Sequence, residues 1–212
     1  MTKQLIKICG IRDAKTAREA AIAGADFIGI VFHHLSPRFV GLEQAKAIAT
    51  AVTIGGALPV AVFMDHNAAT MCSICAATGI RIIQLHGMAR AYHQHMPAEY
   101  QKIYVLTVAK HGELKLDEGL IDLDPMRDYI LIDNNQPGLG KPIINRPKFH
   151  YDLPFSWFLA GGLSSANVGA AIAAWQPNGV DVSSGVELSR GNKDLSLIQQ
   201  FINSVRRSKH AI

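Results

Sequence analysis

Two side chains that could carry acid–base chemistry stand at the ends of apolar runs. Cys9 ends the run 5–9, and Asp133 ends the run 129–133. A cysteine close to positive charge forms a thiolate near neutral pH and can act as a base or a nucleophile. A carboxyl group in apolar surroundings has a raised pKa and can act as a general acid. The residues alone leave simpler interpretations open, with Cys9 as a small buried hydrophobe and Asp133 as a turn residue.

Two clusters of glycine and serine have the composition of phosphate-binding turns. Each follows an apolar run, and glycine lets backbone N–H groups come close to an anion. Turns of this kind after the seventh and eighth strands of a barrel often hold a phosphate group. Ordinary strand-ending turns are the alternative. The clusters are Gly161, Gly162, Leu163 and Ser164, and Ser183, Ser184 and Gly185.

Two further polar residues follow or end apolar runs. Arg38 follows Ser36 and Pro37 in a loop, and its planar guanidinium suits a carboxylate or a phosphate. A solvated surface arginine is the alternative. Asp181 lies at the end of the last predicted strand, where a side chain can reach a ligand.

Metal and nucleotide motifs are incomplete in this chain. The segment 72–75 has C-x-x-C spacing, but it has no second pair and falls within a predicted helix. No histidine pair has the H-E-x-x-H spacing, and the segment 138–141 lacks the remaining residues of a P-loop. We therefore expect no metal site and no P-loop.

Eight short runs rich in Val, Ile and Leu alternate with segments of helical spacing. This alternation is typical of βαβ units in a parallel sheet. Asp13 and Asn67 are predicted to begin helices, Gly24 to end the first one, and Pro97 to end a helix between the fourth and fifth strands. The predicted strands are 5–9, 27–32, 59–63, 80–85, 103–108, 129–133, 157–160 and 180–182.

Eight such units in 212 residues predict an α/β fold, a single-domain (β/α)8 TIM barrel over residues 1–212. A doubly wound open sheet is the alternative. In a barrel, residues at the carboxyl-terminal strand ends surround the active site. Cys9, Asp133, Arg38 and the glycine–serine turns would then surround one opening.

Composition argues against several classes of protein. With 49% apolar and 18% charged residues, the chain is globular rather than disordered. The net charge of +4 is scattered and only 7% of residues are aromatic, which suits a small anionic substrate better than a nucleic acid. No apolar run is long enough to span a membrane, and no signal peptide is evident. Three cysteines fit a reducing compartment, so we expect a cytoplasmic protein.

The motifs together resemble those of the phosphoribosylanthranilate isomerase family of tryptophan biosynthesis. The resemblance runs over nearly the whole chain, and the order KICG, QLHG, DVSSGVE is specific to it. The matching segments are KICGI at 7–11, GADFIGIVF at 24–32, SPRFV at 36–40, AVF at 61–63, QLHG at 84–87, ILID at 130–133, LAGGLSSANV at 159–168 and GVDVSSGVE at 179–187.

The resemblance implies an Amadori rearrangement that uses no cofactor and converts N-(5-phosphoribosyl)anthranilate to 1-(2-carboxyphenylamino)-1-deoxyribulose 5-phosphate. Asp133 matches the family's general acid, and Cys9 matches its general base. Arg38 is expected to hold the anthranilate carboxylate, Asp181 to orient a sugar hydroxyl, and the glycine–serine turns to hold the phosphate. The expected partner is this small phosphorylated substrate, with no nucleic acid or membrane. The sequence is compatible with a monomer or a homodimer.

The chain departs from the family pattern after the sixth predicted strand, where a GGTGK-type loop and an aromatic segment are usual. Residues 136–141 keep two glycines and the lysine but have leucine in place of threonine, and residues 143–145 lack the aromatics. This departure favours one alternative, a phosphate-ligand-binding barrel without catalysis. Retention of Cys9 and Asp133 argues against that alternative.

Two related barrel classes fit less well. Enzymes similar to indole-glycerol-phosphate synthase rely on lysine and glutamate, but no lysine ends a predicted strand in a suitable setting, and Lys7 lies inside the first one. A metal-dependent pentose-phosphate epimerase needs several strand-end histidines and aspartates, and His86 with Asp133 is too few.

Overall fold

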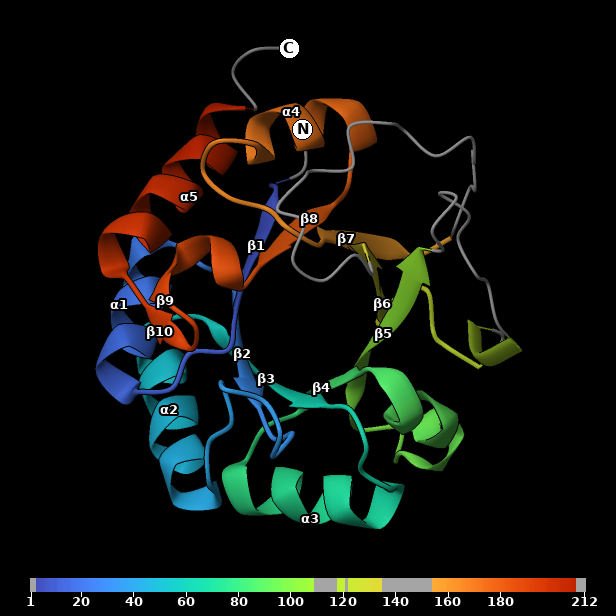
Figure 1. Cartoon of the computed structure of the whole chain (residues 1–212). Helices are drawn as coiled ribbons and strands as arrows, with labels where there is room; N and C mark the ends of the chain where they lie inside the picture. The colour runs from blue at the N-terminus through green and yellow to red at the C-terminus, as the bar shows by residue number, and fades with distance from the viewer. Residues whose placement is uncertain (1–2, 109–117, 121, 135–153, 209–212) are drawn as a thin grey trace.

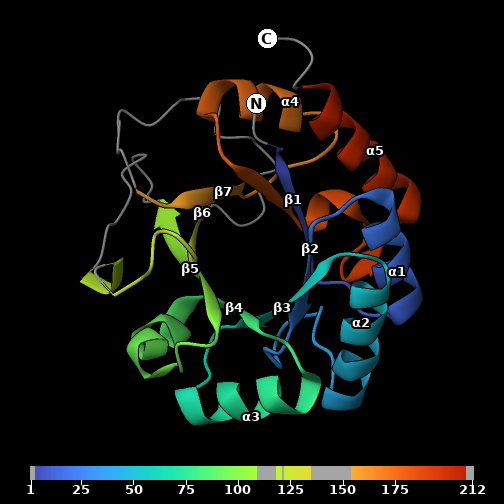
Figure 2. The same ribbon diagram turned by 180° about the vertical axis from the view of Figure 1, so that it is seen from behind.

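The computed structural model describes residues 3–108, 118–120, 122–134 and 154–208. Eight parallel strands close into one barrel in the order β1 to β8, with β8 pairing with β1. Figure 1 looks along this barrel, with α-helices outside it, and Figure 2 shows the same arrangement from behind. The closed barrel confirms the predicted TIM fold and excludes the open sheet. None of the helices in the described ranges has the length and apolar character needed to cross a bilayer.

All eight predicted strands are present, and no strand end differs from the prediction by more than two residues. β4, for example, begins at Ile82 rather than at Ile80. The barrel strands are β1 (Leu5–Cys9), β2 (Phe27–Val31), β3 (Leu58–Phe63), β4 (Ile82–Leu85), β5 (Gln101–Val108), β6 (Tyr129–Asn134), β7 (Ser156–Ala160) and β8 (Gly179–Val182).

The predicted helix ends are confirmed by their capping contacts. The side chain of Asp13 accepts a hydrogen bond from the Thr16 N–H at 2.8 Å, and the helix ends at Gly24 with φ of 111°. Asn67 accepts from the Thr70 N–H at 2.9 Å in the same way. The α-helices of the described residues are α1 (Ala14–Ala23), α2 (Leu42–Ile54), α3 (Ala68–Thr78), α4 (Val168–Trp175) and α5 (Leu195–Arg207).

The helix predicted between β4 and β5 is present as a 3-10 helix, η1 (Gly87–His95), rather than as an α-helix. The Ala89 N–H donates to the Met64 carbonyl at 2.9 Å and to the His86 carbonyl, three residues before it, at 3.2 Å. Spacing of three residues is the 3-10 pattern, and the contact with Met64 withdraws this N–H from α-helical bonding. The prediction that the helix ends before Pro97 is confirmed.

Shorter elements complete the described chain. A short hairpin follows β8 and leads into α5, and its two strands pair antiparallel. These elements are the 3-10 helices η2 (Glu118–Leu120) and η3 (Ser184–Val186) and the strands β9 (Glu187–Ser189) and β10 (Asn192–Lys193).

The barrel interior is apolar at its amino-terminal end. Phe27, Tyr129 and Phe158 pack edge to face there, with ring centroids 5.3 to 5.9 Å apart. A Cβ at Gly179 would lie 2.4 Å from the Phe158 ring, so glycine leaves the room that this aromatic cluster occupies. The cluster closes this end of the barrel, which leaves the carboxyl-terminal end for polar chemistry.

One ion pair lies inside the barrel, between β1 and β8. Lys7 is fully buried, and its Nζ donates to Asp181 Oδ1 at 2.7 Å. The two residues are paired in the register of the strands that close the barrel. Burial alone would lower the pKa of Lys7, but the charge of Asp181 and its hydrogen bond to Lys7, with a contribution from the neighbouring Cys9, outweigh burial and raise the pKa. Lys7 is therefore a cation, held in place by its partner.

We expect Lys7→Met to destabilise the protein strongly, because it leaves the Asp181 carboxylate buried without its cation. Breaking a buried pair from one side costs about 3–5 kcal/mol, and urea unfolding followed by circular dichroism measures this loss. Lys46→Met is the matched control, since Lys46 pairs with Glu43 at 2.7 Å on the exposed surface. The control should cost less than about 1 kcal/mol. Equal losses in the two variants would contradict a structural role for the buried pair.

Candidate active site

The predicted acid, base and sugar-binding residues lie at the carboxyl-terminal ends of the strands. Cys9 is the last residue of β1, while Asp133 and Asp181 each lie one residue before the end of their strands. The charges of Lys7 and Asp181 act on both Cys9 and Asp133. The structure therefore brings these side chains together at one opening of the barrel.

Cys9 is a buried thiol, 8% exposed, with cations around it. Burial raises its pKa, the positive charges of Lys7 and Lys193 oppose this, and the negative charge of Asp181 adds to it. A Cβ at Gly29 would lie 2.7 Å from the Cys9 sulfur, so this glycine on β2 leaves room for the thiol. The thiol form predominates at neutral pH, and the two lysines stabilise the thiolate when it forms.

Asp133 has the environment of a general acid. Burial raises its pKa to about 6, and the nearby Asp181 carboxylate adds to this, whereas Lys7 opposes it. The carboxyl therefore titrates near neutral pH, and a general acid is most effective when its pKa lies close to the pH of the reaction. The expected raised pKa of Asp133 is therefore found, and its largest cause is desolvation, as the apolar strand predicted.

Arg38 is held at this opening by an ion pair rather than being solvated. Its Nε and Nη2 donate to the two carboxylate oxygens of Glu187 at 2.6 and 2.9 Å. These bonds use two of the five guanidinium N–H donors, so three remain for a ligand. Gly10 has φ of 82°, and a Cβ there would lie 2.4 Å from Arg38 Cδ, so glycine is needed for this close approach.

The two glycine–serine turns pack against each other. Gly161 and Gly162 have φ of 97° and 67°, which favours glycine at both positions. A Cβ at Gly185 would lie 1.9 Å from the Leu163 carbonyl oxygen, so the turns could not approach this closely with any larger residue. The turn after β7 and the turn after β8 therefore form one surface.

The serines of these turns differ in their contacts. The Ser164 N–H donates to the Asn167 side chain at 2.8 Å and is not available to a ligand there. The Ser183 hydroxyl donates to the Cys9 carbonyl at 3.0 Å. Ser184 is exposed. Ser183 thus anchors its turn to β1, and Ser184 is the more accessible hydroxyl.

Three charged residues of this opening were not predicted to belong to the site. Lys7 could have been found, because side chains alternate along a strand and Cys9 facing the interior places Lys7 on the same side. Glu187 on β9 accepts a hydrogen bond from Arg38, and Lys193 on β10 donates one to Glu187. No spacing rule connects those two residues to a loop so far away in the sequence.

Other sequence features lie outside this opening. Cys72 and Cys75 are free thiols within α3, as expected, and Cys75 is buried. In the part of the chain that the structure describes, His, Cys, Asp and Glu side chains do not gather in groups of three or more suited to a metal ion. The departing loop at 136–141 and the segment 143–145 lie outside the described residues.

Comparison with known proteins places this chain in a family. The family model for N-(5'-phosphoribosyl)anthranilate (PRA) isomerase matches residues 6–204. N-(5'-phosphoribosyl)anthranilate isomerase of Chlamydia caviae is 36% identical, over 98% of this chain and 99% of that protein. The chloroplastic isomerase 1 of Arabidopsis thaliana is 37% identical, over 96% of this chain and 75% of that protein.

Solved structures agree with the sequence comparison. The crystal structure of phosphoribosyl anthranilate isomerase from Thermotoga maritima has a TM-score of 0.77 and 27% identity, covering 97% of this chain and all of that one. Another isomerase structure, in complex with reduced 1-(o-carboxyphenylamino)-1-deoxyribulose 5-phosphate, has a TM-score of 0.75 and 27% identity, with the same coverage. The family match over almost the whole sequence agrees with the closed barrel, and the chain belongs to the N-(5'-phosphoribosyl)anthranilate isomerase family.

Proposed function

We propose that Asp133 is the general acid and Cys9 the general base of the isomerisation of N-(5-phosphoribosyl)anthranilate in tryptophan biosynthesis. The observation that supports this most is the pairing of a partly buried carboxyl, with a pKa of about 6, and a buried thiol at one barrel opening. Both face an interior whose charges come from Lys7 and Asp181. A carboxyl with a raised pKa suits the acid step, and a thiol beside the cations Lys7 and Lys193 suits the base step.

In the first step, protonated Asp133 donates its proton to the ring oxygen of the furanose. The C1–oxygen bond breaks, and the anilino nitrogen supplies the electron pair that forms a Schiff base. Burial keeps a useful fraction of Asp133 protonated near neutral pH, since its pKa is about 6. An aspartate with an ordinary pKa would be almost fully ionised under these conditions.

In the second step, the Cys9 thiolate takes the proton from C2 of the sugar. The C–H electron pair forms the C1–C2 double bond of an enolamine, and the Schiff-base electrons return to nitrogen. Tautomerisation then gives the ketone, so C1 is reduced while C2 is oxidised within one molecule. The positive charges of Lys7 and Lys193 favour the thiolate that this step needs.

The remaining site residues bind the two anionic ends of the substrate. Arg38 would donate hydrogen bonds to the anthranilate carboxylate from the N–H groups that do not bond to Glu187. Asp181 would orient a sugar hydroxyl next to Cys9 and Asp133. The phosphate would lie on the joined surface of the two turns formed by Gly161, Gly162, Ser183, Ser184 and Gly185.

We expect Cys9→Ala and Asp133→Asn each to lower kcat by roughly 10²- to 10⁴-fold, because each removes one proton-transfer group. The assay follows the loss of anthranilate fluorescence from freshly generated substrate, with EDTA present. Affinity for the reduced product analogue should stay within about threefold, since the binding groups remain.

Cys72→Ala is the matched control, because Cys72 is another free cysteine and lies in α3, away from the barrel opening. It should keep the activity of the wild type. Near-wild-type turnover in Cys9→Ala or Asp133→Asn would disprove the role of that residue. Absence of turnover in the wild type, with analogue binding intact, would favour a binding barrel without catalysis.

We expect Asp133→Asn to stabilise the protein at neutral and higher pH. The carboxyl has a pKa of about 6 in the folded protein and an ordinary value of 3.8, so the folded state holds more protons between these values. Stability of the wild type therefore falls as pH rises through this window, on the order of 2–3 kcal/mol in total. Asparagine has no such loss.

Urea unfolding of both proteins at pH 4.5 and at pH 8 measures this effect. The advantage of Asp133→Asn should be large at pH 8 and small at pH 4.5. A constant difference at the two pH values would show that Asp133 titrates normally in the folded protein.

A further inference from the structure

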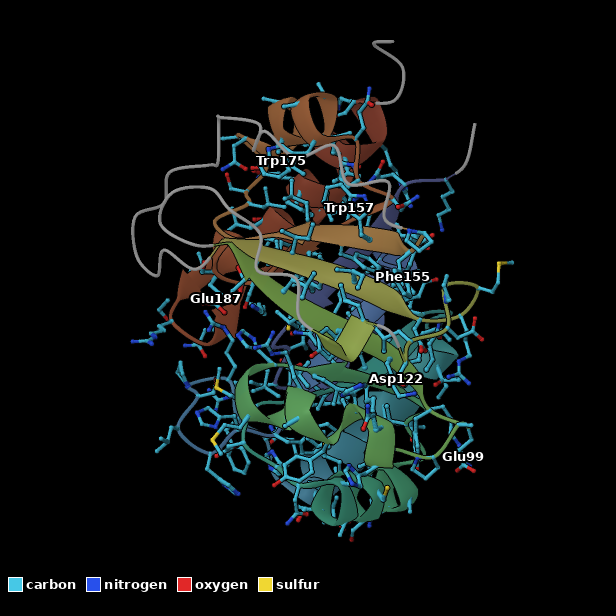
Figure 3. The ribbon with its side chains drawn as sticks, turned by 90° about the vertical axis from the view of Figure 1, so that its right-hand side faces the viewer. Glu99, Asp122, Phe155, Trp157, Trp175 and Glu187 are labelled. Atoms are coloured by element: carbon cyan, nitrogen blue, oxygen red, sulfur yellow. The ribbon has the colours of Figure 1, made fainter. Side chains whose placement is uncertain are left out.

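A network of three charged side chains connects the loop after β2 with the hairpin after β8. Arg38 donates twice to Glu187, and Lys193 donates to Glu187 Oε1 at 2.7 Å. The side chains of Glu187 and Lys193 are 4% and 2% exposed, and that of Arg38 is 20% exposed. Figure 3 shows Glu187 at one end of the barrel, with Phe155 and Glu99, which precede β7 and β5, at the other.

Glu187 is the centre of this network and is tightly bound. Besides the three bonds from Arg38 and Lys193, its Oε2 accepts from the Gly191 N–H at 3.2 Å. Burial alone would raise the pKa of Glu187, but the hydrogen bonds from Arg38 and Lys193 outweigh it and lower the pKa to about 2. Glu187 is therefore ionised at every pH at which the protein is used, and its carboxylate fixes the guanidinium in a planar, bidentate orientation.

The hairpin that carries Lys193 is pressed against the loop that carries Arg38. Gly191, between β9 and β10, has φ of 88°, and a Cβ there would lie 2.6 Å from the Pro37 carbonyl oxygen. Glycine therefore permits both the turn of the hairpin and its contact with the residue before Arg38. The two segments cannot shift independently without breaking this contact.

The network continues to Ser183 in the turn after β8 and to Cys9 at the end of β1. Lys193 Nζ donates to the Ser183 carbonyl at 2.9 Å and to its hydroxyl at 3.2 Å. The Ser183 hydroxyl in turn donates to the Cys9 carbonyl. An unbroken series of polar contacts thus runs from Arg38 through Glu187, Lys193 and Ser183 to Cys9.

The network has a net positive charge, which favours binding of an anion. Arg38 and Lys193 contribute two positive charges and Glu187 one negative charge, so one positive charge is uncompensated within the network. An arginine alone at this position would be free to rotate, whereas a bidentate partner fixes the direction of its remaining donors. Such pre-organisation lowers the entropy that a ligand must overcome on binding.

We propose that Glu187 is a positioning residue that couples the two anion-binding ends of the site: it aims Arg38 at the substrate carboxylate and, through Lys193, holds the Ser183 turn for the phosphate. This inference rests on the proposed function. It adds a residue that touches neither end of the substrate yet determines how well both are bound. A residue that only supported the hairpin would affect stability and would leave ligand discrimination unchanged.

The test compares two ligands by titration calorimetry: the reduced product analogue and the same compound without its carboxyl group. The wild type should bind the carboxylated compound roughly tenfold or more tightly, as a hydrogen bond to a charged group implies. Glu187→Gln keeps the shape of the side chain but removes its charge. It should reduce this ratio at least about threefold and also weaken the binding of inorganic phosphate.

Two further variants make the outcome specific. Arg38→Met should abolish the discrimination, and adding Glu187→Gln to it should change the ratio no further, because Glu187 acts on the carboxylate through Arg38. Glu187→Asp keeps the charge on a shorter side chain and should give an intermediate ratio. If Glu187→Gln does not fold, Glu187→Asp provides the same test. The matched control is Glu43→Gln, which breaks an exposed ion pair with Lys46 and should leave both affinities unchanged.

The outcomes separate this inference from the proposed function. A wild-type ratio in folded Glu187→Gln, or an equal further loss in the Arg38→Met background, would overturn the positioning role while wild-type turnover stands. Failure of the wild type to turn over substrate or to prefer the carboxylated compound would overturn the proposed function, and the positioning role with it. A ratio lowered by Glu187→Gln only when Arg38 is present is the expected result.

Discussion

The buried ion pair between Lys7 and Asp181 is the constraint on which the rest of the barrel depends. It lies where β1 and β8 meet, so the same two strands that close the sheet also hold the charges of its interior. The attraction between the two charges offsets the cost of removing each of them from water. Each charge of the pair acts on both neighbours in the same sense, since Lys7 favours the ionised forms of Cys9 and Asp133 and Asp181 favours their protonated forms. The contact that closes the barrel therefore also sets the charges that act on Cys9 and Asp133.

The interior of the barrel is divided along its axis. Aromatic rings fill the amino-terminal end, where Phe27, Tyr129 and Phe158 exclude water. Charged groups occupy the other end, and the low polarity beneath them strengthens every electrostatic interaction there. Desolvation is accordingly the largest cause of the pKa shifts of both Cys9 and Asp133. The apolar half of the interior thus influences the titration of groups in the charged half.

Much of the fold followed from the sequence because its signals are local. Alternating apolar runs predicted all eight strands, and Asp13, Gly24 and Asn67 marked helix ends through contacts within a few residues. The predicted helix before Pro97 is present, but its 3-10 form was not predictable from local sequence, because the carbonyl of Met64 in another loop accepts from the Ala89 N–H. Candidate site residues at strand ends were recognisable from type and place. Glu187 and Lys193 could not be recognised in the same way. Their place in the site depends on the contact of Glu187 with Arg38, which is distant in sequence and becomes close only after folding.

The contact between Gly185 and the Leu163 carbonyl has a consequence for how this barrel can change over generations. Because there is no space between them for a single methyl group, a change in the loop after β7 requires a matching change in the loop after β8. An insertion in either would displace the other. The segment after β2 is tied to the segment after β8 as well, through the bonds from Arg38 to Glu187 and the close contact of Gly191 with Pro37. A change of loop length in one of these three segments therefore requires a compensating change in the segments that touch it.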